Sequence, residues 1–211
     1  MKINLPTGLC STFLWSEEVG QGFHTQPPMQ YDGGYFANYQ KLDQTPMGAS
    51  LTKARVDLVA KYCPDGLVVD IGIGGGRFVE DGQAMGYDVC PDAVKWLKDS
   101  GRWYDMYGFA QRVKHPPAAV TCWDSLEHIP DVDDFMARVP DWLFVSMPIY
   151  TGLTGVLTSK HYKPGEHLHY WTLPGFLRWA EEQGFACLEY NKMETELGRE
   201  GIVTFVLKRG M

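Results

Sequence analysis

Short apolar runs predict a series of strands along this chain, and segments with helical spacing or capping residues separate them. The predicted strands cover residues 67–70, 84–89, 102–105, 118–123, 142–147, 185–190 and 202–208. The predicted helices cover residues 50–62, 92–98, 131–139 and 174–183. Pro148 is expected to end the strand that precedes it. Strands that alternate with helices indicate an α/β fold.

A glycine-rich turn follows the strand over 67–70. Asp70 stands two residues before Gly72, and Gly74 and Gly76 continue an Asp-x-Gly-x-Gly-x-Gly pattern. A strand, a glycine turn and a helix N-terminus together let a ligand contact backbone N–H groups directly. Dinucleotide-binding proteins have Gly-x-Gly-x-x-Gly instead, and Arg77 occupies the position of their third glycine. The turn therefore fits a pyrophosphate poorly.

This turn resembles motif I of the class I methyltransferases that use S-adenosylmethionine (SAM). In that family the glycine turn allows the methionine part of SAM to lie against the backbone. The acid at the position of Asp70 orients the loop or meets the SAM ammonium group. The resemblance implies a set of SAM-binding residues here: Asp70, Gly72, Ile73, Gly74 and Gly76. The plainer alternative is a tight strand-to-helix turn that binds nothing.

Two further acids are candidates for SAM contacts. Asp88 lies near the end of the next strand, where a carboxylate can accept hydrogen bonds from both ribose hydroxyls. The segment Tyr87–Leu97 resembles motif II of the family, which implies that Asp88 and Val89 bind the ribose. An ordinary helix cap is the alternative for Asp88. In the family an acid after the third strand often meets the adenine amino group, which points to Asp105.

Residues Leu126–Asp131 read Leu-Glu-His-Ile-Pro-Asp. This closely resembles the Leu-Glu-His-Val/Ile-Pro-Asp signature after the fourth strand in methyltransferases of the ubiquinone-biosynthesis type and their relatives. The resemblance runs from about residue 31 to 209. It implies a doubly wound, Rossmann-like α/β fold with a mostly parallel seven-stranded sheet whose last strand is antiparallel. It also implies that Trp123 and Asp124 lie beside SAM.

The expected domain organisation is a single methyltransferase domain over residues 31–211. Residues 1–30 show no clear period and are expected to form an irregular lead-in that folds over the body as a lid. Only 11 residues separate Gly76 from Asp88, so the first crossover helix is predicted to be barely two turns long.

One group of candidate catalytic residues follows the fourth strand and consists of Asp124, Glu127 and His128. In ubiquinone-type O-methyltransferases the matching Glu-x-x-Glu-His residues are associated with a divalent cation. Two carboxylates and an imidazole can bind such a cation and lower the pKa of an acceptor hydroxyl. Here the first acid is one methylene shorter. The favoured interpretation is that Glu127 and His128 support the fold, and no metal site is predicted.

A second histidine-rich segment covers residues 161–171. Its His-x-His pattern next to Glu166 can ligate zinc or iron, but a loop that faces the acceptor is the favoured interpretation. We expect a general base to help when the acceptor is a hydroxyl. The candidates from this segment are His161 and His167 as catalytic residues, with Tyr162 and Trp171 beside the acceptor.

Three residues upstream of the first central strand are candidates for the SAM carboxylate: Tyr35, Tyr39 and Arg55. The resemblance suggests them because Tyr and Arg residues at such positions sometimes reach that group in the family. The alternative is that they are packing aromatics and a surface arginine.

Composition narrows the partners and the compartment. The net charge of −7, without a Lys/Arg run, disfavours a surface that follows a phosphate backbone, so no nucleic acid is expected. The five cysteines are widely spaced without a Cys-x-x-Cys, which indicates reduced thiols. No apolar run is long enough to span a membrane, and the expected location is cytoplasmic.

The predicted function is methyl transfer from SAM to a small-molecule acceptor at oxygen or nitrogen, with S-adenosylhomocysteine as the product. Three alternatives stay open. They are a methyltransferase that acts on a macromolecule, a nicotinamide-dependent oxidoreductase, and a non-catalytic SAM-binding protein. The sequence makes no prediction of the oligomeric state.

Overall fold

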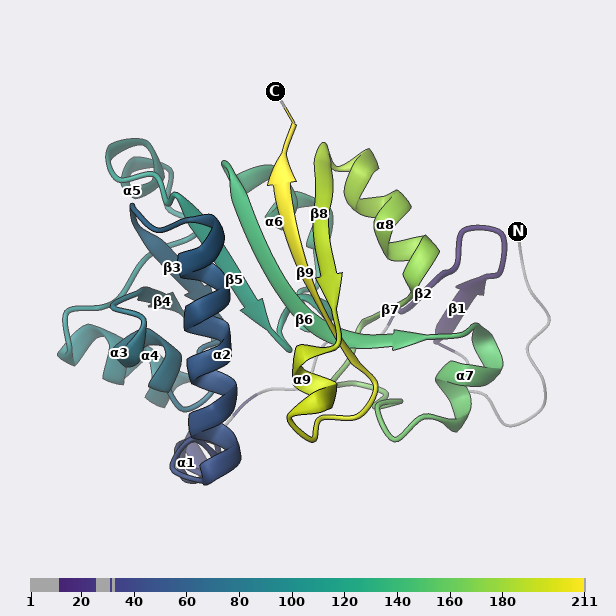
Figure 1. The fold of residues 1–211 in the computed structure, drawn as a ribbon, viewed down its shortest axis with the longest axis horizontal. Helices are drawn as coiled ribbons and strands as arrows, with labels where there is room; N and C mark the ends of the chain where they lie inside the picture. Colours follow the sequence, from purple (N-terminus) through teal and green to yellow (C-terminus); the bar gives the residue numbers. More distant parts are fainter. Residues whose placement is uncertain (1–11, 26–30, 32, 211) are drawn as a thin grey trace.

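The structure of the protein is a computed structural model that describes residues 12–25, 31 and 33–210 (Figure 1). The strands are β1 (Phe13–Ser16), β2 (Gln21–His24), β3 (Val68–Ile71), β4 (Met85–Tyr87), β5 (Ala119–Trp123), β6 (Trp142–Tyr150), β7 (His169–Thr172), β8 (Phe185–Asn191) and β9 (Ile202–Arg209). The helices are α1 (Gly33–Asp43), α2 (Pro46–Tyr62), α3 (Arg77–Asp81), α4 (Pro91–Asp99), α5 (Phe109–Lys114), the 3-10 helix η1 (Leu126–His128), α6 (Val132–Arg138), α7 (Leu153–Thr158), α8 (Leu173–Glu182) and α9 (Met193–Glu196).

The central sheet has the strand order β4-β3-β5-β6-β9-β8. Strands β4, β3, β5 and β6 are parallel, whereas β9 is antiparallel to both β6 and β8. This arrangement confirms the predicted mostly parallel sheet with a reversed last strand. Because the strands are parallel, the carboxyl ends of β3, β4 and β5 meet at one edge, where ligands bind in open α/β sheets.

Helices cover both faces of this sheet, and Figure 1 shows α2 and α8 on opposite sides of it. Side chains of β5 alternate between the two faces, as the pleat requires. Val120 and Cys122 join the large core cluster that contains α6 and α8, while Ala119 and Trp123 join the cluster that contains α2 and α3. The sheet is therefore buried on both sides, which explains why its strands are almost continuously apolar.

An N-terminal β-hairpin extends the sheet beyond the predicted strands. Strands β1 and β2 pair antiparallel, β2 pairs with β7, and β7 runs parallel to the last residues of β6. The prediction of an irregular lead-in is therefore wrong for these residues. Phe13 and Trp15 alternate inward and are buried, but two four-residue strands are too short to produce a clear period. The expected lid over residues 1–11 and 26–30 lies outside the described residues.

The predicted third strand over residues 102–105 is reduced to one isolated bridge between Trp103 and Gly86. Two backbone hydrogen bonds form it, with Gly86 N donating to Arg102 O and Tyr104 N donating to Gly86 O, both at 2.8 Å. Beyond this bridge the chain turns, and Asp105 N donates to a side chain, the Gln111 amide oxygen, at 3.1 Å.

Two predicted boundaries are shifted by prolines. Helix α2 begins at Pro46 because Thr45 caps it, accepting a hydrogen bond from Gly48 N at 3.1 Å, and proline is well suited to the first helical position. Pro148 does not end β6, which continues to Tyr150. On this side of β6 the pairing with β5 ends at Ser146 and the pairing with β7 begins at residue 149. Pro148, which has no backbone N–H, therefore lies in the gap between these two partner strands, where no hydrogen bond is lost.

Candidate active site

The glycine turn after β3 has the open backbone that the motif predicts. Gly72, Gly74 and Gly76 have φ angles of 72°, 57° and 91°, in a region that residues other than glycine rarely adopt. A Cβ on Gly72 would lie 2.7 Å from the Cβ of Ser125, so the turn also packs against the residues that follow β5. Helix α3 has 5 residues, which confirms the short first crossover helix.

Asp70 lies beneath this turn and is only 1% exposed. Its Oδ1 accepts a hydrogen bond from the Thr121 hydroxyl at 2.6 Å, and the two residues are paired in the β3–β5 register. Burial raises the pKa of the Asp70 carboxyl to about 7. The resemblance implied that this acid either orients the loop or meets the SAM ammonium group. The observed contact with Thr121 links two strands below the loop and therefore agrees with the orienting role.

Asp88 connects the turn to the start of α4. Its Oδ2 accepts a hydrogen bond from Ile73 N at 2.9 Å, and its Oδ1 accepts one from Cys90 N at 2.7 Å. Burial raises the pKa of this carboxyl. Each carboxylate oxygen has a second lone pair, so these contacts leave acceptor capacity for hydroxyl groups. The neighbouring Val89 is 65% exposed and offers an apolar surface beside it.

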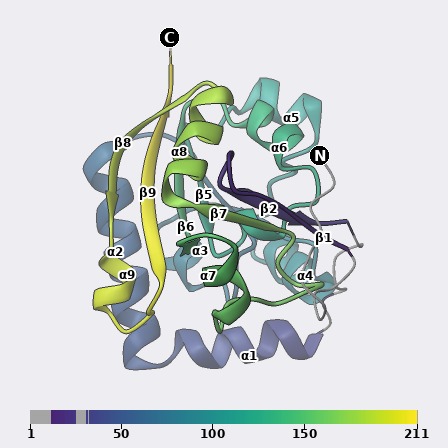
Figure 2. The same cartoon turned by 90° about the vertical axis from the view of Figure 1, so that its right-hand side faces the viewer.

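Helix α1 lies over the glycine turn and runs across the end of the molecule away from the C-terminus (Figure 2). A Cβ on Gly75 would lie 2.6 Å from Gln40 N, and one on Gly74 would lie 3.4 Å from the Tyr39 ring. Asp43, at the end of α1, accepts a hydrogen bond from Arg77 N at 3.2 Å. Helix α1 thus covers the glycine turn, although the sequence pattern did not predict a helix there.

Three tyrosines form a row from the turn to the residues after β5. The ring centroids of Tyr39 and Tyr35 are 4.7 Å apart, and those of Tyr35 and Tyr31 are 4.6 Å apart. The Tyr31 hydroxyl lies 2.9 Å from Nδ1 of His128. Sequence reasoning missed Tyr31 as a site residue, although the spacing of four between these tyrosines is the signal of one helical face.

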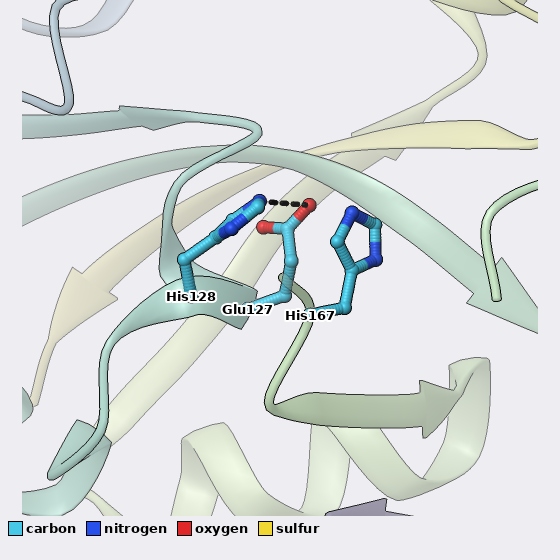
Figure 3. Close-up of side chains that lie close together, drawn as sticks. All are labelled: Glu127, His128 and His167. Carbon is cyan, nitrogen blue, oxygen red and sulfur yellow. Dashed lines mark ion pairs between the residues drawn. The ribbon is translucent and has the colours of Figure 1, made fainter. Parts of the chain in front are cut away.

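Glu127, His128 and His167 come together at the end of the row, where Tyr31 contacts His128. Figure 3 shows these three side chains. One potential ligand atom from each residue lies within 4.8 Å of the others. The His128 and His167 ring centroids are 4.7 Å apart, and Nε2 of His128 is 3.9 Å from Oε1 of Glu127. The loop that carries His167 is tied to η1 by a hydrogen bond from Leu168 N to Glu127 O at 2.8 Å.

The electrostatics of this cluster follow from its burial. Glu127 is 2% exposed. Burial raises the pKa of its carboxyl well above the ordinary value, and the negative charge of the nearby Asp124 raises it further. Burial lowers the pKa of His128. Burial also lowers the pKa of His167, to about 2, and the neighbouring His128 contributes to this shift. Both imidazoles are therefore neutral at pH 7, and each neutral ring has a lone pair that can accept a proton or bind a metal ion.

Asp124 is held outside the cluster by an ion-pair network. Its carboxylate pairs with Arg199 and lies 3.5 Å from Arg55. Arg55 also makes two hydrogen bonds, of 2.8 and 3.0 Å, to the fully buried Glu194, and its guanidinium lies over the Trp123 ring. Asp124 is therefore not positioned with Glu127 and His128 as the cation hypothesis assumed. Sequence reasoning missed Glu194 and Arg199, because no local pattern marks a contact so distant along the chain.

The remaining candidates lie apart from this cluster. Asp105 caps a turn, accepting hydrogen bonds from Tyr107 N at 3.2 Å and Gly108 N at 2.9 Å. Nε2 of His161 is 2.9 Å from the Glu200 carbonyl oxygen. Trp171 is completely buried in the main core, and Tyr162 packs against the aromatic cluster of the N-terminal hairpin. A core position does not suit the acceptor contact expected of Trp171.

Comparison with known proteins gives the family. The profile of a family described as "Methyltransferase domain" matches residues 47–190, which is more than half of the chain. The chain therefore belongs to this family, and the resemblance to class I SAM-dependent methyltransferases is confirmed. A search of curated protein sequences finds no match.

Several solved structures share the fold. A magnesium protoporphyrin IX methyltransferase from Synechocystis with bound S-adenosylhomocysteine has a TM-score of 0.58 and 14% identity, covering 84% of this chain and 95% of that chain. A SAM-dependent methyltransferase from Clostridium acetobutylicum has a TM-score of 0.60 and 11% identity over 83% and 99% of the two chains. A Burkholderia thailandensis 1,6-didemethyltoxoflavin-N1-methyltransferase, crystallised with that compound and S-adenosylhomocysteine, has a TM-score of 0.51 and 13% identity over 90% and 96%.

Two further expectations can be compared with the described residues. None of their helices is both long and apolar enough to cross a membrane. The four cysteines among them, Cys63, Cys90, Cys122 and Cys187, are free thiols.

Proposed function

We propose that this protein transfers a methyl group from SAM to a small-molecule acceptor, at oxygen or nitrogen, and releases S-adenosylhomocysteine. The observation that carries the proposal is the placement of two sites at one edge of the sheet. The glycine turn over residues 72–76 and the cluster of Glu127, His128 and His167 are connected by the tyrosine row, of which Tyr35 and Tyr39 lie on α1 and Tyr31 just before it. Cofactor and acceptor would then meet beneath the same helix.

SAM would be held by the turn and by Asp88. The three left-handed glycines turn backbone groups toward the ligand without a side chain in the way, and Tyr39 lies against Gly74 at the same place. Asp88 would accept hydrogen bonds from the ribose hydroxyls while its bonds to Ile73 N and Cys90 N keep it fixed. Such fixed acceptors orient the cofactor, and methyl transfer depends strongly on orientation.

The acceptor would lie against the neutral imidazoles. Methyl transfer forms a bond from the acceptor oxygen or nitrogen to the methyl carbon as the bond from carbon to sulfur breaks. The acceptor must also lose its proton, and a positioned group that assists this step typically accelerates it by about 10²–10⁴-fold. His128 is suited to that assistance because it is neutral at pH 7 and oriented by Tyr31.

A small acceptor agrees best with the charge and with the neighbours. The net charge of −7 works against a nucleic acid backbone. Among the solved structures of similar fold, the Synechocystis and Burkholderia enzymes are named for small-molecule acceptors. A dinucleotide cofactor is disfavoured because Arg77 replaces the third glycine and is bonded to Asp43 of α1.

Calorimetric titration tests the cofactor, and turnover tests the activity. We expect the protein to bind SAM and S-adenosylhomocysteine with Kd values in the micromolar range and to show no heat with NAD. Binding of NAD alone would overturn the proposal. Mass spectrometry of reactions with hydroxyl, phenol and amine acceptors should then detect a methylated product. SAM binding without turnover across these acceptors would instead support the non-catalytic alternative.

A further inference from the structure

We propose that Glu127, His128 and His167 form a binding site for a divalent transition-metal ion of the zinc type. The carboxylate and one imidazole come from η1, the second imidazole comes from the loop before β7, and one ligand atom from each residue lies within 4.8 Å of the others (Figure 3). Metal binding itself does not depend on SAM. The role of the ion in activating an acceptor rests on the proposed function.

The first argument is an unpaired buried carboxylate. Glu127 is 2% exposed, and neither of its oxygens has a hydrogen-bond partner among the described residues. A buried polar group without a partner is unusual in folded proteins and often indicates a missing ion or water. The nearby cation Arg199 does not serve Glu127, because its guanidinium bonds to Asp124 and Glu194. A divalent cation would supply the missing partner.

The second argument is the spacing of the donor atoms. Zinc bonds to nitrogen and oxygen are about 2.0–2.2 Å long, so two ligands of a tetrahedral ion lie about 3.4 Å apart. Oε1 of Glu127 and Nε2 of His128 are 3.9 Å apart. A small rotation of these side chains would bring them to the ligand distance. The His167 ring approaches His128 edge-on, which leaves both rings able to direct a nitrogen toward the same point.

The third argument is the hydrogen bond on the far side of His128. The Tyr31 hydroxyl lies 2.9 Å from Nδ1 of His128. If Nδ1–H donates to the tyrosine oxygen, Nε2 carries the free lone pair that faces Glu127. Metal-binding histidines commonly have their second ring nitrogen occupied in this way, because that bond sets the tautomer and the ring orientation.

The loop with His167 is also held in place from two directions. Leu168 N donates to Glu127 O at 2.8 Å, and His24 N donates to Leu168 O at 2.8 Å. The first bond joins the loop to η1, and the second joins it to the N-terminal hairpin. The hairpin of β1 and β2 therefore helps to keep His167 beside Glu127 and His128. These two strands, which the sequence pattern did not predict, thus contribute to the site.

The donor set indicates which ion it would hold. Two imidazole nitrogens and one carboxylate suit Zn²⁺, Fe²⁺ or Co²⁺, whereas Mg²⁺ and Ca²⁺ prefer oxygen ligands. Three protein ligands also leave a position for another group. With the ion bound, the His128 lone pair would serve as a ligand, so the ion and not the imidazole would assist deprotonation. An acceptor hydroxyl in the open position would lose its proton to water more readily. Its oxygen would then bond to the methyl carbon as the bond from carbon to sulfur breaks.

The experiment uses the full chain after treatment with a chelator. We expect calorimetry to show one Zn²⁺ per chain, with a Kd of micromolar or tighter and at least 100-fold weaker binding of Mg²⁺. Co²⁺ should give visible absorption bands of a complex with nitrogen ligands. Failure to bind Zn²⁺ at one per chain would overturn the proposal.

Variants locate the ion. Glu127→Gln and His167→Ala should each weaken Zn²⁺ binding at least tenfold, while His115→Ala, at an exposed histidine, should not change it. Glu127→Gln replaces the unpaired carboxylate by a neutral group of the same shape, so the metal-free variant should melt no lower than the wild type. It should also lose the rise in Tm that Zn²⁺ causes in the wild type. Equal Zn²⁺ affinity in the wild type and both cluster variants would refute the site.

The two proposals can fail separately. If SAM binds and Zn²⁺ does not, the metal site is wrong and the proposed methyltransferase function stands. If Zn²⁺ binds at the cluster and SAM does not bind, the metal site stands and the proposed function is wrong.

Discussion

Asp70 should make the stability of this protein depend on pH in a direction opposite to that of an ordinary paired carboxylate. It lies under the glycine turn, 1% exposed, and accepts one hydrogen bond from Thr121. The perturbation is Asp70→Asn, which removes the charge and keeps the shape. The amide oxygen can still accept the hydrogen bond from Thr121, so the variant isolates the cost of the buried charge.

The magnitude follows from the pKa of Asp70, which burial raises from its ordinary value of 3.8 to about 7. Between these two pH values the folded protein binds a proton at Asp70 that the unfolded chain does not. The free energy of unfolding therefore falls as the pH rises through this window and levels off above it. One pKa unit corresponds to about 1.4 kcal/mol, so the full loss is about 4 kcal/mol, of which about 3 kcal/mol falls between pH 5 and pH 8.

Urea unfolding of the wild type and Asp70→Asn at pH 5, 6, 7 and 8 measures this effect. Relative to the wild type, the variant should gain about 3 kcal/mol of unfolding free energy from pH 5 to pH 8. Asp65→Asn, at an exposed position, controls for the loss of one charge from the whole chain. If the stability curves of the wild type and Asp70→Asn run parallel within about 0.5 kcal/mol, the assignment of a buried, protonatable Asp70 is wrong.

Three further predictions test the surroundings of the site. Glu194→Ala leaves Arg55 and Arg199 without their buried partner and should destabilise the protein by about 3–5 kcal/mol in urea unfolding; a loss below about 1 kcal/mol would contradict this. Asp88→Asn leaves one acceptor oxygen for the two backbone N–H groups that the carboxylate now serves. The variant should weaken SAM binding at least tenfold, or about 1.4 kcal/mol, in calorimetry. Unchanged affinity would exclude Asp88 from the ribose site. Gly75→Ala places a Cβ 2.6 Å from a backbone nitrogen of α1, so it should cost about 1–3 kcal/mol and weaken SAM binding, and an unaffected melting temperature would refute the close approach.

The strands and the cofactor loop were predictable because their signals are local. A parallel strand buried on both faces is an almost continuous apolar run, and β3, β5 and β6 all show it. The glycines at 72, 74 and 76 have left-handed backbones, which only glycine adopts readily, so the geometry is marked by the residue type itself. Strands β1 and β2 have only four residues each and gave weak signals. Helix α1 has 11 residues, but it begins with two glycines and has no clear apolar stripe, so it was not predicted either.

The sequence by itself determined the family, the succession of central strands along the chain and the cofactor loop, since each depends on residues close together in the chain. The order of those strands within the sheet came from the structure. Only the tertiary structure decided which side chains meet. Asp124 stands three residues before Glu127, yet it pairs with Arg199, and the partner that reaches Glu127 and His128 is His167. Such contacts depend on how β6, β7 and the N-terminal hairpin pack, because packing sets the path of the chain between distant segments. No spacing in the sequence encodes that path.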